Sequence, residues 1–154
     1  MTIHYSNSRR TFLGAGSALA VASFFGVSGR AFATLEDVEK AISEFGGGAE
    51  AQAGKITLTA PEIAENGNSV PISVTVESPM TDDDYVESVM ILAEGNPSPD
   101  VATFHFTPAS GKALGTTRMR LAQTQNVIAV ARMSDGTIFK DTRNVKVTIG
   151  GCGG

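Results

Sequence analysis

Cysteine, tryptophan and histidine are scarce in this chain, and each scarcity excludes a class of protein. The 154 residues contain one cysteine, no tryptophan and two histidines. A single cysteine has no partner for an intramolecular disulfide, and the chain lacks the cysteine pair and tryptophan of true antibody domains. There is also no Cys/His cluster of the kind that binds zinc. Any function must therefore depend on the few reactive groups that remain.

The first 33 residues are predicted to be a cleaved export signal. Arg9 and Arg10 precede an uncharged segment, residues 11–29, that is rich in Ala, Gly, Phe and Val. This arrangement resembles a twin-arginine signal, and it is followed by a small-x-small cleavage pattern that ends at Ala33. We expect cleavage there and a periplasmic location for the mature protein. An uncleaved membrane anchor is the alternative, which glycines within the segment oppose.

The mature chain predicted from this cleavage is acidic and long enough for one domain. It comprises 121 residues, sufficient for a single hydrophobic core. The signal removes three arginines and no acidic residue, so nine basic residues face sixteen acidic ones and the formal net charge is −7. This charge argues against binding to nucleic acid, to anionic membranes or, by electrostatic capture, to small anions.

Apolar periodicity predicts one short helix and about seven strands. Residues 34–45 carry apolar side chains at helical spacing, with Thr34 as a candidate N-cap and three glycines after the last turn. Beyond a small-residue linker the period changes to two. The predicted strands are residues 55–60, 70–76, 85–93, 101–107, 116–123, 127–133 and 137–149, the last with a break near Thr142 as an option.

This pattern is typical of an all-β, immunoglobulin-like antiparallel β-sandwich with a short N-terminal helix and a flexible C-terminal tail. After the signal we assign residues 34–54 to the helix and a glycine-rich linker, residues 55–149 to the sandwich, and residues 150–154 to the tail.

Few side chains of the predicted domain are arranged for catalysis or metal binding. His105 alternates with two phenylalanines and is expected on the polar face of a strand. Residues 82–84, three successive aspartates, lack the ligand spacing of a calcium loop and are expected to form a solvated turn. Four methionines are expected in the core rather than at a soft-metal site, namely Met80, Met90, Met119 and Met133.

The C-terminal sequence GGCGG, residues 150–154, places the only thiol, Cys152, between glycines. Glycine neighbours leave the sulfur unshielded, and no cation adjoins it in the sequence to activate it. From Ile149 to the thiol an extended chain adds roughly 10 Å of reach. We interpret Cys152 as a handle for a covalently attached group, presented to several enzymes in turn, rather than as a catalytic residue. An incidental thiol on a disordered end is the alternative.

The ending VKVTIGGCGG, residues 145–154, follows a twin-arginine signal and a short β-rich domain, and in this it resembles the SoxY family. These proteins are the cysteine-bearing subunits of the periplasmic sulfur-oxidation (Sox) carrier complex. The resemblance covers essentially the whole chain, and the tail is its specific part. It implies a sulfur carrier that is not an enzyme and has no cofactor or metal. Cys152 would be the attachment site, and the flexible arm would consist of Gly150, Gly151, Gly153 and Gly154.

The resemblance also implies partners. A SoxZ subunit would form a heterodimer with this chain, and a haem enzyme would conjugate thiosulfate to the cysteine. A metal-dependent hydrolase would then release sulfate, and a molybdenum enzyme could oxidise the remaining sulfane sulfur. Residues 89–92 of the strand predicted at 85–93 are apolar on both faces, which we interpret as a surface that a partner covers.

Two other functions remain open from the sequence. A ubiquitin-like sulfur donor would be activated as a thiocarboxylate at the Gly153-Gly154 end, although the export signal and the scarcity of helix oppose this. An exported structural or adhesin-like sandwich could dimerise through a Cys152 disulfide. Replacing Cys152 distinguishes a carrier, which would lose its whole pathway, from a structural domain, which would lose only its dimer.

Overall fold

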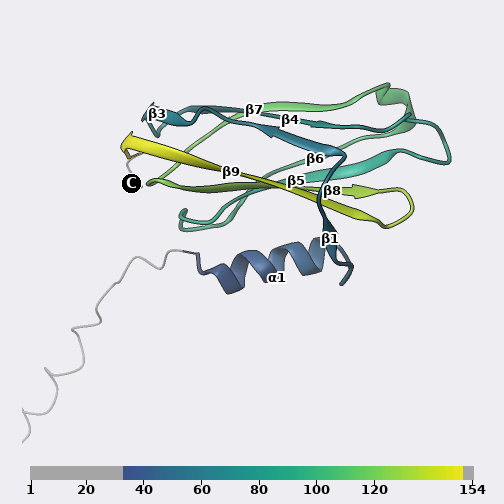
Figure 1. Ribbon diagram of the computed structural model, residues 1–154, viewed down its shortest axis with the longest axis horizontal. Coiled ribbons are helices and arrows are strands. Elements are labelled where there is room, and N and C mark those ends of the chain that lie inside the picture. The colour runs from purple at the N-terminus through teal and green to yellow at the C-terminus, as the bar shows by residue number, and fades with distance from the viewer. Residues whose placement is uncertain (1–32, 151–154) are drawn as a thin grey trace, which may run out of the picture. The chain divides into compact units, whose positions relative to one another are not determined.

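The computed structural model describes residues 33–150, in which nine strands form two sheets and a single α-helix is present. The sheets lie face to face, and α1 lies along the outer face of the larger sheet (Figure 1). The larger sheet has the order β1-β9-β8-β5-β6, with β3 also paired to β9, and the smaller sheet has the order β2-β4-β7. The predicted fold class, an all-β sandwich with a short N-terminal helix, is confirmed.

The bounds of the elements follow the chain order. They are α1 Leu35–Phe45, β1 Ala51–Gln52, β2 Ile56–Thr59, β3 Ile63–Asn66, β4 Val70–Val76, β5 Val86–Ala93, β6 Asp100–His105, the 3₁₀ turn η1 Pro108–Ser110, β7 Ala113–Met119, β8 Gln125–Met133 and β9 Ile138–Ile149.

The helix begins where the sequence predicts. The hydroxyl of Thr34 accepts from the Asp37 N–H at 3.2 Å, and the Asp37 carboxylate accepts from the Thr34 N–H at 2.8 Å. This reciprocal capping box satisfies two of the free N–H groups that every helix N-terminus exposes. At the other end the chain leaves the helix through Gly47 at φ +62°, a conformation that suits glycine.

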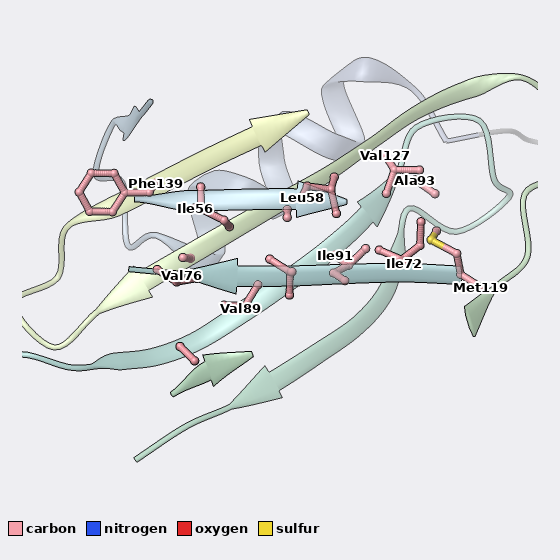
Figure 2. Packing of buried hydrophobic residues seen from close by; sticks show 14 of the residues in the cluster. Ile56, Leu58, Ile72, Val76, Val89, Ile91, Ala93, Met119, Val127 and Phe139 are labelled. Atoms are coloured by element: carbon pink, nitrogen blue, oxygen red, sulfur yellow. The ribbon is translucent and has the colours of Figure 1, made fainter. Parts of the chain in front are cut away.

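Alternating side chains from the two sheets meet between them. Along β4 every second residue is buried, and Ile72 and Val74 are at most 1% exposed. Figure 2 shows Ile72 on the side of β4 that faces the larger sheet, whose Ile91 and Val127 belong to the same buried cluster. Each large apolar side chain buried in this way stabilises the fold by about 1.5–3 kcal/mol, so the core between the sheets holds the sandwich together.

The strand β5 is buried on both faces, and α1 explains why. Val89 and Ile91 belong to the core between the sheets, whereas Met90 and Leu92 belong to a second buried cluster that includes Val38 of the helix. The interpretation that this doubly apolar strand is a surface for a partner is therefore wrong, because the chain's own helix covers the outer face.

Three strands differ from the sequence prediction, and a fourth, β9, settles an option that the sequence left open. The strand predicted at residues 116–123 is β7, Ala113–Met119, because the chain leaves the small sheet after Met119 and crosses to the large one. β9 continues unbroken past Thr142, which pairs with Ile128. The short strands β1 and β3 were not predicted, and both pair with β9 in parallel, so the sandwich is not wholly antiparallel.

Candidate functional site

The described chain ends at Gly150, the residue directly after β9. The predicted attachment site, Cys152, lies outside the described residues, as do the other three glycines of the tail (Gly151, Gly153 and Gly154) and the arginine pair of the signal (Arg9 and Arg10). What the structure describes is the point from which the tail leaves the domain. We call this point the tail root and define it as residues 147–150.

The tail root is hydrogen-bonded to chain segments on two sides. The Ile149 carbonyl accepts from the Gly67 N–H at 2.8 Å, and the Thr148 hydroxyl donates to the Glu65 carbonyl at 2.8 Å. On the other side the Val147 N–H donates to the Thr124 hydroxyl at 2.9 Å. The last strand is therefore held along its length up to the residue before Gly150.

Gly150 lies against the backbone of the segment between β7 and β8. A β-carbon built on Gly150 would be 2.5 Å from the carbonyl oxygen of Ala122, closer than real β-carbons come to any atom. The neighbouring atom belongs to the backbone, so it cannot rotate away as a side chain could. Gly150 is half-buried here, and its lack of a side chain is needed for close approach.

A partly buried polar network, with Gln125 as its buried member, holds the segment that contacts Gly150. The Asn96 side-chain oxygen accepts from the Ala122 N–H and from the Gln125 amide, both at 3.0 Å, and its amide donates to the Arg120 carbonyl at 2.9 Å. The Gln125 side-chain oxygen accepts from the Gly95 N–H at 2.6 Å. Gln125 is only 6% exposed, and we call this set of bonds the Asn96–Gln125 network.

Sequence reasoning did not predict the Asn96–Gln125 network. Asn96 precedes Pro97, and this dipeptide favours a turn without indicating a network. Gln125 opens a strand as a buried polar residue, which no periodicity distinguishes from an exposed one. The role of such a residue depends on contacts between distant segments, and these follow from the fold alone.

Two arginines of the sandwich, Arg118 on β7 and Arg143 on β9, are bonded within the domain. Arg118 donates from Nε to the Ser69 hydroxyl at 2.7 Å, and Arg143 donates to the Leu58 carbonyl at 3.0 Å and pairs with Asp141 at 3.3 Å. Lys146 is exposed and makes no ion pair within residues 33–150.

The other residues considered for chemistry occupy the positions that the sequence predicts. His105 is exposed at the end of β6, opposite Ser88 of β5. The three aspartates at residues 82–84 lie in the turn before β5, and two of them are exposed. The four methionines are all buried, with exposed fractions of 7% or less (Met80, Met90, Met119 and Met133).

Two aspartates have a lowered pKa, and both accept hydrogen bonds from nearby backbone N–H groups. The pKa of Asp37 is lowered first by the backbone N–H of Thr34 and then by the Thr34 hydroxyl. The pKa of Asp135 is lowered first by the backbone N–H of Thr137 in the β8–β9 turn. Both groups stabilise local backbone, and neither belongs to the tail root.

Within the described chain, no group of three or more His, Cys, Asp or Glu side chains is close enough together to hold a metal ion. Among residues 33–150, no helix is long and apolar enough to cross a membrane.

Comparisons with known proteins place the chain in a family. Residues 42–152 match the family model described as sulfur oxidation protein SoxY. The match ends at Cys152, so it takes in the tail as far as the thiol. A comparison with curated proteins found no match.

Solved structures agree with the family match. The sulfur carrier protein SoxY from Chlorobium limicola f thiosulfatophilum has 35% sequence identity and a TM-score of 0.63, covering 74% of this chain and 98% of that one. Superoxide reductase (neelaredoxin) from Ignicoccus hospitalis has 17% identity and a TM-score of 0.55, covering 66% of this chain and 91% of its own. The second likeness, at such low identity, concerns the fold alone. The family match over most of the sequence and the 35% identity to a sulfur carrier together show that this chain belongs to the SoxY family of sulfur oxidation proteins.

Proposed function

We propose that this chain carries thiosulfate-derived sulfur as a covalent adduct on Cys152 and presents it to periplasmic enzymes. Membership of the SoxY family supports a sulfur carrier role in sulfur oxidation. The observation that carries the finer proposal is the family match through residue 152, in a chain whose last strand ends three residues earlier. The only thiol therefore lies just beyond a firmly held strand end.

The proposed loading step is an oxidative conjugation. The sulfur of Cys152 forms a bond to the sulfane sulfur of thiosulfate, giving a cysteine S-thiosulfonate. One proton leaves the thiol, and two electrons pass to a haem-containing enzyme, which is the oxidant. The chain itself supplies only the nucleophilic sulfur, so an accessible thiolate is the property that this step requires.

The proposed second step is hydrolysis. Water attacks the sulfonate sulfur of the adduct at a metal-dependent hydrolase, sulfate and two protons are released, and a persulfide anion remains on Cys152. This step changes no oxidation state overall. A molybdenum enzyme would then oxidise the attached sulfane sulfur from the persulfide to a cysteine S-sulfonate. Three waters supply the oxygen atoms, and six protons and six electrons are released, the electrons to an acceptor of that enzyme.

We propose that the chain is not itself an enzyme and holds no resident cofactor. In the part of the chain that the structure describes, the single histidine is exposed and belongs to no cluster of candidate metal ligands. Catalysis would need a positioned acid, base or metal beside the reacting sulfur. In this proposal the partner enzymes supply those groups.

Membership of the SoxY family implies a SoxZ partner within the Sox system. We propose a stable heterodimer, which the chain would form through a surface other than the outer face of β5, since α1 covers that face. The chain purified from its source should therefore co-elute with a second small β-rich subunit. Recovery of a monomer alone at micromolar concentration in gentle buffer would contradict the heterodimer.

We propose export by the twin-arginine route and cleavage after Ala33. The helix begins at Leu35 with its cap at Thr34, so this cleavage would leave the capping box in place. It would remove the bond from the Ala33 N–H to the Asn96 carbonyl, which is 3.0 Å long. The new amino terminus at Thr34 would keep Asp37 as a hydrogen-bond acceptor.

Intact-mass spectrometry of the chain purified from its own periplasm tests the proposal. We expect an amino terminus at Thr34 and a set of masses that differ by sulfane sulfur or thiosulfonate groups. A thiol reductant should remove all of these adducts, because they are joined through S–S bonds. Protein isolated during growth on thiosulfate but free of any reducible adduct would refute the carrier proposal.

A further inference from the structure

The tail root contains a glycine whose contacts differ from those expected of a flexible arm. Gly150 is the first glycine of the GGCGG sequence, yet it is half-buried against the Ala122 carbonyl at a separation that no β-carbon would allow. A glycine that serves only for flexibility has no need of such a contact, because free space would surround it. The other reason for glycine, close approach of two backbones, applies at this position.

The residue before Gly150 is fixed by a chain of backbone hydrogen bonds. The Ile149 carbonyl accepts from the Gly67 N–H at 2.8 Å, and the Gly67 carbonyl accepts from the Leu121 N–H at 2.8 Å. Leu121 is fully buried in the core between the sheets. The end of β9 is therefore linked to the core through the β3–β4 turn, by bonds that do not depend on any side chain.

The surface that meets Gly150 is also fixed. Ala122 follows Leu121 and donates its N–H to Asn96, which the buried Gln125 holds from the other side. A network whose polar groups are paired with one another resists displacement, because moving one member leaves others unsatisfied. No buried side-chain nitrogen or oxygen of the described residues lacks a partner. Ala122 is thus a rigid seat rather than part of a mobile loop.

We propose that Gly150 is the fixed anchor of the carrier arm and that the arm begins only at Gly151. The Asn96–Gln125 network positions this anchor by holding Ala122 against it. This inference rests on the proposed carrier function of Cys152 for its significance, but its structural content does not depend on sulfur chemistry.

The anchor limits where the thiol can go. Two peptide units separate the α-carbons of Gly150 and Cys152, and an extended chain spans about 3.3–3.6 Å per residue, so the distance is at most about 7 Å. An enzyme that reacts with Cys152 must therefore work within that distance of Gly150, at one end of the sandwich. Enzymes that process the cargo must approach that end, and Gly150 and the Asn96–Gln125 network act as positioning residues for every one of them.

Backbone dynamics of the unaltered protein give the first test. In the exported chain, labelled with ¹⁵N and purified with its partner subunit, we expect the heteronuclear NOE of Gly150 to equal that of Val147. The NOE should fall from Gly151 onward. A value for Gly150 as low as that of Gly153 would overturn the proposal, because Gly150 would then move with the arm.

A pair of matched substitutions gives the second test. Cys152 is the only cysteine, so a nitroxide label attached to it reports on the arm alone. Gly150→Ala should raise the mobility of the label and shift the amide resonances of Ala122 and Gly67, because the new β-carbon expels residue 150 from its seat. Gly151→Ala makes the same chemical change one residue later, and it should lower the label's mobility or leave it unchanged without moving those resonances.

The two variants would respond alike if both glycines belonged to the arm, and that result would overturn the proposal. The role of Ala122 is tested separately with Asn96→Ala. This substitution removes the hydrogen-bond acceptor of the Ala122 N–H, so it should lower the NOE of Gly150 although Asn96 lies in another loop. An unchanged NOE at Gly150 would show that the network does not position the anchor. These readouts detect no sulfur transfer, so the anchor can fail while Cys152 still carries cargo, and the reverse also holds.

Discussion

Phe104 on β6 covers Gly115 on β7 so closely that a β-carbon on the glycine would lie 2.8 Å from the Phe104 ring. β6 is an edge strand of the large sheet and β7 an edge strand of the small one. The phenylalanine therefore closes the core where neither sheet has a further strand. Because Gly115 has no side chain, it leaves the space that the Phe104 ring occupies.

Gly115→Val should destabilise the domain by about 1–3 kcal/mol, because overpacking forces the ring out of its position. Urea unfolding of the variant and the parent measures this loss. The same substitution in a Phe104→Ala background should cost much less, since the clashing ring is gone. Equal costs in both backgrounds would show that the two residues are not coupled.

Asp141 and Arg143 of β9 join the two sheets at the opposite edge. The Asp141 carboxylate accepts from the Leu58 N–H of β2 at 2.9 Å, while the Arg143 guanidinium donates to the Leu58 carbonyl at 3.0 Å. Asp141→Ala should cost about 1–3 kcal/mol, because it leaves a partly buried N–H without its acceptor. Thr142→Ala, on the exposed residue between them, is the control and should stay within about 0.5 kcal/mol. Equal losses in chemical denaturation would contradict this bridge.

The capping box predicts a stability change in acid. Hydrogen bonds from Thr34 lower the pKa of Asp37 below its ordinary value of 3.8, so the folded state prefers the carboxylate. The resulting stabilisation is present above pH 3.8 and is lost as the pH falls below that value toward the lowered pKa.

Thermal unfolding from pH 6 down to about pH 3 measures this loss. Asp37→Ala should unfold at a lower temperature than the parent at pH 6, and the difference should shrink in acid. Asp100→Ala, which removes another exposed aspartate outside the capping box, is the matched control. A constant difference between Asp37→Ala and the parent across the pH range would exclude the carboxylate as the cause.

The sequence was sufficient for those parts of the fold that local patterns determine. The helix followed from its apolar stripe and from Thr34, and β4 followed from strict alternation, because each pattern reports a single face buried against one neighbour. β3 was missed because only Ala64 of its four residues is buried, so no period is visible. Its parallel pairing with β9 joins segments about 80 residues apart, which no local pattern encodes.

In the tail, too, local sequence predicts some features, whereas others depend on contacts that only the fold creates. Its composition identified Cys152 as the candidate attachment site, and the role of the flanking glycines as an arm stays a prediction. The contact of Gly150 with Ala122 could not be inferred, because glycine is equally suited to mobility and to close approach. Only the fold brings the segment between β7 and β8 to the end of β9.

The function itself is tested by replacing the thiol. Cys152→Ser should leave the unfolding free energy within about 0.5 kcal/mol of the parent and should preserve partner binding, since the residue lies beyond the last strand. It should abolish thiosulfate-dependent turnover in a reconstituted system, because a hydroxyl cannot form the S–S bond that all later steps require. A structural protein that dimerises through a disulfide would lose only its dimer in this variant.

His105→Ala is the matched control for chemistry within the domain. His105 is the only histidine of the described residues and is exposed, so its removal should leave turnover nearly unchanged. Gly151→Trp tests the arm separately. Its thiol should still react with a small alkylating reagent, while turnover by partner enzymes falls because the widened arm no longer enters their channels. If His105→Ala stopped the reaction and Cys152→Ser did not, the chemistry would reside in the sandwich and the carrier function would be wrong.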